Sequence, residues 1–418
     1  MRTLTRRGFI AGALAAAGGT AVGLLLDRGL GSAKAPAPVA LGAQPGGLPE
    51  RQHAWTATLA RDAEGNAVPP RFHRLLFFDV RGAPTSAHAR VLEASLRTLE
   101  RRYPWGPSGL LFVVGWGPRY FTGSLSAPSP VPVARELSDF ELPAIDDYEM
   151  CLQLSCDDEA RLGAVESSLL HGTPLAGAEG ALALSAALRW RETRTGFVGE
   201  GLPAARQQIG GIPAGRPVPR RAPLFMGFKS SLRRNQASED DVTIPNGPFA
   251  QGTTMQASYM QLRLETWYGQ LDESERVARM YAPQVTPAQA AAFTTDARSD
   301  PGRFGEAVAR YGVVGHSQAT ARARRAGRPL ILRRDFNTVD GGQAGLHFVS
   351  IQRTIEDFVK TREAMNAAHA QLQNPSITDT VNNGVNEFIF VLKRGNYIVP
   401  PRPLRSFPLL PGRERALI

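Results

Sequence analysis

The sequence predicts an α+β protein made of two successive units, each an antiparallel sheet with helices packed on it. Short apolar segments of strand type alternate with segments of helical period in both halves of the chain. A Gly- and Pro-rich stretch, residues 210–223, separates the halves. The 418 residues, 43% of them hydrophobic, suffice for two domains with buried cores. We therefore expect one domain over residues 61–220 and a second over residues 221–418.

The first half has the element order strand, helix, strand, strand, helix, which is typical of a ferredoxin-like domain. The expected strands are 73–80, 109–115 and a segment that includes 151–154, and the expected helices are 87–102 and 160–170. Leu92, Leu96 and Leu99 recur at helical spacing and would fall on one side of the first helix.

The second half repeats this mixture without any repeat of sequence, so we expect a second ferredoxin-like domain. The expected strands are 258–265, 330–334 and 345–352, and the expected helices are 271–280 and 355–365.

The N-terminus is typical of an export signal. Arg6 and Arg7 precede Phe9 and an apolar run, rich in Ala and Gly, that extends to Leu26. A charged start, an apolar centre and a small-residue end make a secretory signal, and adjacent arginines indicate its twin-arginine form. The glycines within the run argue against a structural helix.

We therefore expect residues 1–35 to be the signal segment and residues 36–60 a linker. The twin-arginine translocase would be a partner, and the protein would be periplasmic, attached to the cell envelope or extracellular. The apolar run is barely long enough to cross a bilayer, so an uncleaved segment could also anchor the protein. Because this route carries folded proteins, often with a cofactor already in place, the signal raises the expectation of a bound cofactor.

Charge and cysteine content exclude several classes of function. The net charge is +10, but no stripe of Lys and Arg interleaves with aromatic residues, so we expect no nucleic-acid partner. Cys151 and Cys156 are five apart in a predicted strand, which places them on opposite faces and argues against a local disulfide. No Cys-x-x-Cys-His motif for covalent haem and no zinc-type cysteine spacing occurs.

Three segments of the second half carry a specific resemblance. His316 is followed by an arginine pair that begins with Arg333 at the end of an apolar strand, and then by residues 345–352, Gly-Leu-His-Phe-Val-Ser-Ile-Gln. In this order they resemble the haem-pocket segments of the dye-decolorising (DyP-type) peroxidase superfamily. Residues 145–152 and the Pro-Pro ending of 397–401 are also similar to that family, so the resemblance extends over most of the chain.

The resemblance implies non-covalent haem b in the C-terminal domain near the domain interface, with hydrogen peroxide and an electron donor as substrates. His316 would be the axial ligand of the iron, as a neutral imidazole is in peroxidases. Arg333 would be the distal arginine, and Leu346 and Phe348, two apart on a strand, would wall the pocket. The electron donor is not identified by the sequence, and an oligomer is compatible with it.

One part of the family pattern is altered. The family has a Gly-x-x-Asp-Gly signature, whereas this chain has Gly227-Phe228-Lys229-Ser230-Ser231. By this match Gly227, Phe228 and Lys229 border the haem, and Ser230 stands where the family has its distal aspartate. Proton transfer by such an acid is worth roughly 100- to 10,000-fold in rate. The sequence therefore predicts a peroxidase with weakened acid–base catalysis.

Several alternatives stay open. The protein could be an exported haem or porphyrin binder without peroxidase activity, or it could keep the fold and bind no haem. His347 is the nearest rival of His316, although it should face away from Leu346 and Phe348. Arg333 could be a strand-end arginine that reaches solvent. The basic run 322–328 is either a solvated surface or within reach of the haem propionates. Asp379 or Glu387 could accept a hydrogen bond from the second ring nitrogen of His316.

Overall fold

The computed structural model describes residues 46–178, 182–229, 235–291 and 303–410. The predicted signal segment and residues 36–45 of the predicted linker lie outside these ranges. None of the helices that the structure describes has the length and apolarity needed to cross a membrane.

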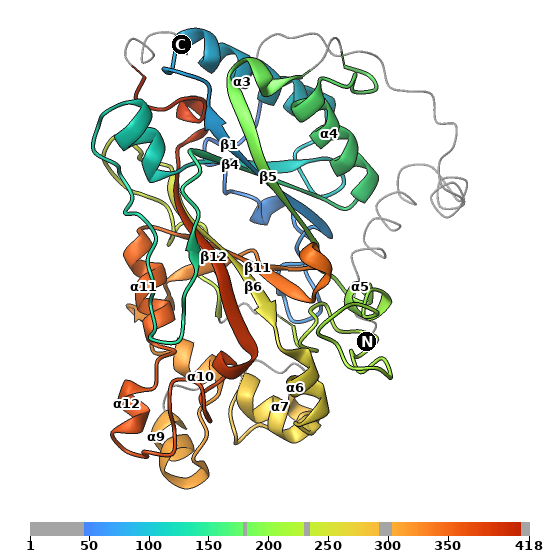
Figure 1. Ribbon diagram of the computed structural model, residues 1–418, viewed down its shortest axis with the longest axis vertical. Helices are drawn as coiled ribbons and strands as arrows, with labels where there is room; N and C mark the ends of the chain where they lie inside the picture. Colours follow the sequence, from blue (N-terminus) through green and yellow to red (C-terminus); the bar gives the residue numbers. More distant parts are fainter. Residues whose placement is uncertain (1–45, 179–181, 230–234, 292–302, 411–418) are drawn as a thin grey trace.

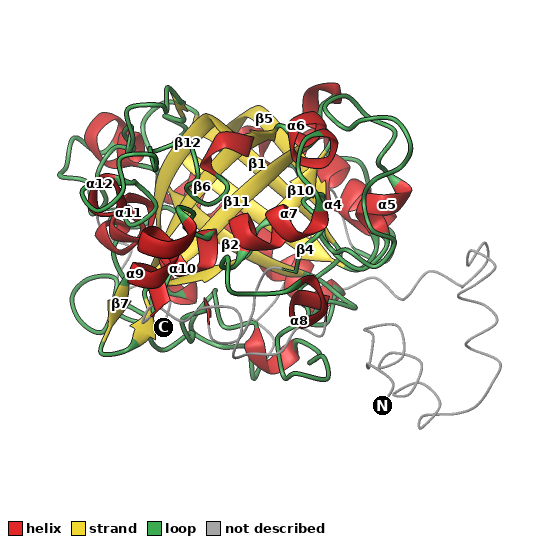
Figure 2. Ribbon diagram, turned by 90° about the horizontal axis from the view of Figure 1, so that it is seen from below, coloured by secondary structure: helices red, strands yellow, loops and turns green. Residues whose placement is uncertain are grey.

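Strands from both halves of the chain form one mainly antiparallel sheet (Figures 1 and 2). Its order is β10-β5-β1-β4-β2-β12-β6-β11-β9, and β10 also pairs with β11, so the sheet closes on itself. The strands are β1 (Phe72–Val80), β2 (Leu111–Trp116), β3 (Ala144–Ile145), β4 (Met150–Cys156), β5 (Leu188–Phe197), β6 (Thr253–Leu262), β9 (Ile331–Arg333), β10 (Phe336–Thr338), β11 (Gly345–Gln352) and β12 (Ile389–Val399).

The helices cover the outside of this sheet, and a small hairpin of β7 (Arg324–Arg325) and β8 (Arg328–Pro329) lies beside it. The helices are α3 (Ser86–Arg102), α4 (Glu159–His171), α5 (Leu202–Ala205), α6 (Leu264–Gly269), α7 (Glu273–Met280), α8 (Pro287–Ala291), α9 (Phe304–Glu306), α10 (His316–Thr320), α11 (Ile355–Glu363) and α12 (Ala368–Gln371).

The N-terminal half contributes the neighbouring strands β5-β1-β4-β2, on which α3 and α4 pack. The predicted apolar side of α3 is confirmed, since Leu92, Leu96 and Leu99 are all fully buried in the main core. The Thr85 side chain accepts a hydrogen bond from the His88 backbone N–H and so caps the helix start. The predicted α+β architecture of antiparallel strands and packed helices is thereby confirmed.

The C-terminal half contributes β12-β6-β11-β9, and the described part of the chain between β6 and β9 forms the short helices α6 to α10. The prediction differs from the structure in two ways here. The two halves share one sheet instead of having separate ones, through the pairs β2–β12 and β5–β10. The predicted strand 258–265 is displaced, because the chain turns into α6 directly after Leu262.

The described part of the predicted linker also differs from expectation, because it packs on the domain. Gln52 accepts a hydrogen bond from the Val114 backbone N–H at 2.9 Å and donates one to the Pro400 carbonyl at 2.8 Å. Trp55 is only 1% exposed. Cys151 and Cys156 are free and buried, in agreement with the absence of a local disulfide.

Candidate functional site

A large cavity lies in the C-terminal half, bordered by the start of α10, by α11, by strands β6, β9 and β11, and by the loop that ends at Lys229. It contains about 1500 Å³ of empty space, including its open mouth. Six of the residues predicted from the sequence line it: His316, Arg333, Leu346, Phe348, Phe228 and Lys229.

Two predicted residues are not among the lining residues. Gly227 lies beneath the cavity wall, where its φ of +88° makes the turn before Phe228. Ser230, the residue at the position of the family's acid, lies outside the described residues.

His316 is held at the cavity by close backbone packing. A Cβ atom at Gly315 would lie 2.0 Å from the Tyr281 carbonyl oxygen, so only glycine fits directly before the histidine. On the other side Gly384, at φ +57°, lies against the His316 backbone. The Gly384 N–H donates to the Val314 carbonyl at 2.7 Å, which fixes the two segments side by side.

The His316 imidazole is buried and neutral. Burial, together with the positive charges of Arg333 and Arg362, lowers its pKa to about 3. Its Nδ1 atom is buried and has no hydrogen-bond partner among the residues that the structure describes. The second-nitrogen partners considered from the sequence are not found. The Asp379 carboxylate instead accepts a hydrogen bond from the Ala367 backbone N–H, and no hydrogen bond joins Glu387 to His316 in the described ranges.

The arginine pair at the end of β9 is divided between two faces. The Arg333 backbone is paired with the side-chain amide of Gln236, whose Oε1 accepts from the Arg333 N–H at 2.7 Å. The Arg333 side chain lines the cavity. The Arg334 guanidinium instead donates to the His53 carbonyl and stacks 3.7 Å from the centroid of the Trp55 ring. Because successive side chains of an extended segment point to opposite sides, Arg333 faces the cavity and Arg334 faces the packed N-terminal segment.

The loop from Phe225 to Lys229 is anchored to the same wall. The Asn337 side chain accepts a hydrogen bond from the Phe225 N–H at 2.7 Å, and the Trp267 indole donates to the Met226 carbonyl at 3.0 Å. The Phe228 ring packs edge-on against Tyr281 at 5.3 Å. Lys229 forms ion pairs with Asp62 and Glu64. These contacts hold residues 225–229, which match the first part of the family signature, in place against the cavity wall.

The strand β11 presents Leu346 and Phe348 to the cavity, as the alternation predicts. His347 faces the other way, is fully buried, and its Nε2 atom lies 3.0 Å from Asp340 Oδ2. His347 is therefore a structural histidine of the opposite face and no rival of His316.

Sequence reasoning missed Asp335, which lines the cavity and is 7% exposed. Asp335 lies in the short link between β9, which ends at Arg333, and β10, so its nearness to Arg333 in the sequence was the available signal.

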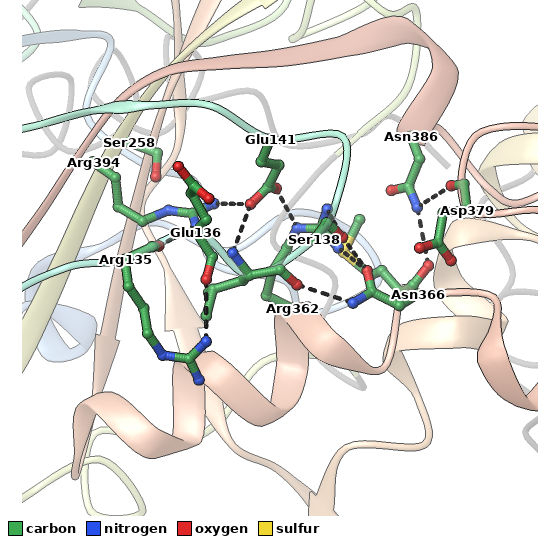
Figure 3. Close-up of polar contacts among 12 residues, drawn as sticks. Arg135, Glu136, Ser138, Glu141, Ser258, Arg362, Asn366, Asp379, Asn386 and Arg394 are labelled. Atoms are coloured by element: carbon green, nitrogen blue, oxygen red, sulfur yellow. Dashed lines mark hydrogen bonds and ion pairs between the residues drawn. The ribbon is translucent and has the colours of Figure 1, made fainter.

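A buried ion-pair cluster on the opposite wall was also missed (Figure 3). We call Glu141, Arg362 and Arg394 the Glu141 cluster. Arg362 Nε donates to Glu141 Oε1 at 2.7 Å, and the Arg394 guanidinium donates to Glu141 Oε2 at 2.9 Å. All three residues are less than 10% exposed, and Glu141 and Arg362 line the cavity. One carboxylate between two guanidinium groups leaves this wall with a net positive charge.

Comparison with solved structures shows the same fold in dye-decolorising peroxidases. The DyP-type peroxidase of Cellulomonas bogoriensis superimposes with a TM-score of 0.56 at 17% identity, covering 88% of this chain and 96% of that one. The dye-decolorizing peroxidase of Bacteroides thetaiotaomicron superimposes with a TM-score of 0.54 at 12% identity, covering 82% of this chain and 96% of that one. A variant of DypB from Rhodococcus jostii, in complex with heme, superimposes with a TM-score of 0.52 at 13% identity, covering 86% of this chain and 99% of that one.

At these identities the structural likeness establishes the fold, and it confirms at that level the resemblance read from the sequence. No curated protein matches the sequence. Residues 70–401 match the family described as a family of unknown function, DUF7405. The match covers most of the chain, so the protein belongs to the DUF7405 family and has the fold of the DyP-type peroxidases.

Proposed function

We propose that this protein binds haem b non-covalently in the cavity, with His316 as axial ligand of the iron, and acts as a peroxidase on an electron donor. The observation that carries the proposal is that His316 and Arg333, predicted from separate motifs, line one cavity in a DyP-type fold. When bound, the haem would supply the iron that exchanges electrons with hydrogen peroxide.

The residues present fit this cofactor. The imidazole is neutral, as an iron ligand must be, and its Nδ1 atom has no competing partner among the described residues. Leu346, Phe348 and Phe228 supply apolar walls for a porphyrin ring. Arg324, from the basic run noted in the sequence, also lines the cavity and is a suitable cation for a propionate.

The remaining residues divide the chemistry on peroxide. With haem bound, the Arg333 guanidinium, which lines the cavity, would stabilise the negative charge that develops as the O–O bond of peroxide breaks. It cannot move a proton at neutral pH. With haem bound, the Asp335 carboxylate, which lines the cavity, would be the group that accepts a proton from hydrogen peroxide and returns it to the departing oxygen. Ser230 is then no longer required as an acid, although its hydroxyl can hold a water.

The second candidate function is an exported haem or porphyrin binder without peroxidase activity. It is favoured by the serine at the position of the family's acid, and it holds if Asp335 transfers no proton. The third alternative, a fold that binds no haem, would leave the orphaned His316 Nδ1 and the large cavity without a role.

An absorption spectrum of the protein, purified from a haem-sufficient host, tests the proposal. We expect a Soret band at one haem per chain and peroxide-dependent oxidation of a reporter dye. His316→Ala should abolish both, whereas His171→Ala, which removes an exposed histidine at the end of α4, should change neither. A Soret band of full intensity in His316→Ala would overturn the ligand assignment. Haem binding without dye oxidation would favour the binder.

Export by the twin-arginine translocase is part of the same proposal, and it places the protein in the periplasm, the cell envelope or outside the cell. The supporting observation is the Arg6-Arg7 segment followed by an apolar run. A route that carries folded proteins suits a cofactor that must be bound before export.

A further inference from the structure

A second cavity lies on the far side of α11 from the first, between the start of that helix, the end of β12 and two proline-containing loops. It contains about 1380 Å³ of empty space, including its mouth, and its residues belong to none of the predicted haem-binding set. Phe358 lines both cavities. The Glu141 cluster also joins them, because Glu141 and Arg362 line the first cavity and Arg394 lines the second.

Three polar side chains of the second cavity have unused hydrogen-bonding atoms. Nε of Arg394, Nε of Arg353 and Oδ1 of Asn396 are buried and have no partner among the described residues. Arg394 is 1% exposed and Asn396 is 5% exposed. Buried polar atoms are satisfied in most proteins, so three orphans in one cavity indicate a missing partner.

Arg353 is the guanidinium of this lining that has no hydrogen-bonded carboxylate among the described residues, although Asp241 is near enough to interact with its charge. Arg394 is paired with Glu141, and Arg135, a third guanidinium on the lining, is paired with Glu363 at 3.3 Å. Arg353 forms no ion pair or hydrogen bond within the described ranges. Among the described lining residues Glu356 is the one carboxylate, and it is exposed. The balance of charge therefore favours an anion.

The nine-residue helix α11 begins at the same place. Its N-cap residue, Thr354, makes no side-chain capping bond, and the Asp357 N–H donates to the Thr354 carbonyl, so the N–H groups of Ile355 and Glu356 remain available. Thr354, Ile355 and Glu356 all line the cavity. A helix N-terminus favours negative charge, and here it adds to the charge of Arg353.

The rest of the cavity is apolar. The lining includes Pro130, Val131, Pro132, Pro248, Phe249, Val359 and Ile398. A free inorganic anion would make no use of these walls, whereas an anion with an apolar body would bury them. The Asn396 Oδ1 atom can accept from a hydroxyl or amide on that body.

We propose that the second cavity binds a small organic carboxylate with an apolar body, its carboxylate at Arg353 and the start of α11, its body against the prolines and Phe249. This binding site is independent of haem. Its position across Phe358 from the first cavity makes it a suitable place for an organic electron donor, a role that rests on the proposed peroxidase function.

Calorimetric titration with 3-phenylpropionate, using the neutral 3-phenylpropanamide as the matched probe, tests the proposal on the whole exported chain. The carboxylate should bind with one site per chain and at least tenfold more tightly than the amide. Arg353→Gln should weaken carboxylate binding about tenfold or more, the loss expected for one hydrogen-bonded charge. Arg90→Gln, which removes an exposed guanidinium on α3, should leave the affinity unchanged.

Equal affinity for acid and amide, or full affinity in Arg353→Gln, would overturn the proposal. Loss of binding in His316→Ala with full binding in Arg353→Gln would place the probe in the first cavity and refute it as well. Because the titration is read without peroxide, its result is separate from that of the peroxidase test. A protein that binds the probe normally but lacks haem would contradict only the proposed function.

Discussion

Replacement of Asp335 by asparagine decides whether this protein has kept an acid–base catalyst. Two carboxylates belong to the described lining of the candidate haem cavity, Glu141 and Asp335. The two carboxylate oxygens of Glu141 accept hydrogen bonds from Arg362 and Arg394, so this carboxylate is held in an ion-pair cluster of the cavity wall. Asp335 lines the same cavity as Arg333 and is 7% exposed, and we propose it as the carboxylate that transfers protons.

The size of the effect follows from the role. A positioned acid–base group contributes roughly 100- to 10,000-fold in rate, or about 2.7–5.5 kcal/mol of activation free energy. Asparagine keeps the volume and one acceptor oxygen of Asp335 but cannot carry a proton. We therefore expect Asp335→Asn to lower kcat/KM for peroxide at least 100-fold, with the haem content and the Soret maximum unchanged.

Stopped-flow measurement of the haem spectrum after mixing with peroxide gives the rate directly. Asp240→Asn is the control, because it removes an exposed aspartate that pairs with Arg51 outside the cavity. If Asp335→Asn reacts within about threefold of the wild type, Asp335 moves no proton and the reasoning fails. If Asp335→Asn does lose the rate, adding Ser230→Asp to it should restore part of that loss, provided that the family's position faces the peroxide.

Two further predictions concern the ligand and export. Ala at Gly384 would place a Cβ 3.1 Å from the His316 Cα, whereas Ala at Gly327, which also has positive φ, would meet no atom within 4 Å. Each change should cost about 1–2 kcal/mol of folding stability, but only Gly384→Ala should weaken haem binding, and equal haem affinity by titration would contradict this. Lys at both Arg6 and Arg7 should leave the precursor in the cytoplasm on cell fractionation, and normal export would point to another route.

The helices and strands that could be predicted from the sequence are those whose apolar side chains recur at a regular spacing and bury one face of the element. Helix α3 and strand β11 carry their apolar patterns within a short segment, and both lie where expected. Strands β5 and β12 were not predicted, because charged residues interrupt their apolar patterns. Arg194 in β5 forms a buried ion pair with Asp146, and Arg394 in β12 pairs with Glu141. A charge that is neutralised by a distant residue looks like a surface residue in the sequence.

The same limit applies to the candidate site. His316, Arg333, Leu346 and Phe348 could be identified because they belong to short motifs of a known family. The Glu141 cluster could not, since Glu141 lies 221 residues from Arg362 and 253 from Arg394. The second cavity likewise combines segments from both halves of the chain, and its apolar lining residues carry no motif.

The segment expected to be a linker is instead part of the support for Arg333. Glu239 accepts hydrogen bonds from the backbone N–H groups of Trp55 at 2.6 Å and Thr56 at 2.8 Å, and lies 3.5 Å from Arg334. Arg334 in turn stacks on Trp55. Because Arg334 directly follows Arg333, the last residue of β9, anchoring Arg334 to the N-terminal segment limits the motion of Arg333 at the cavity.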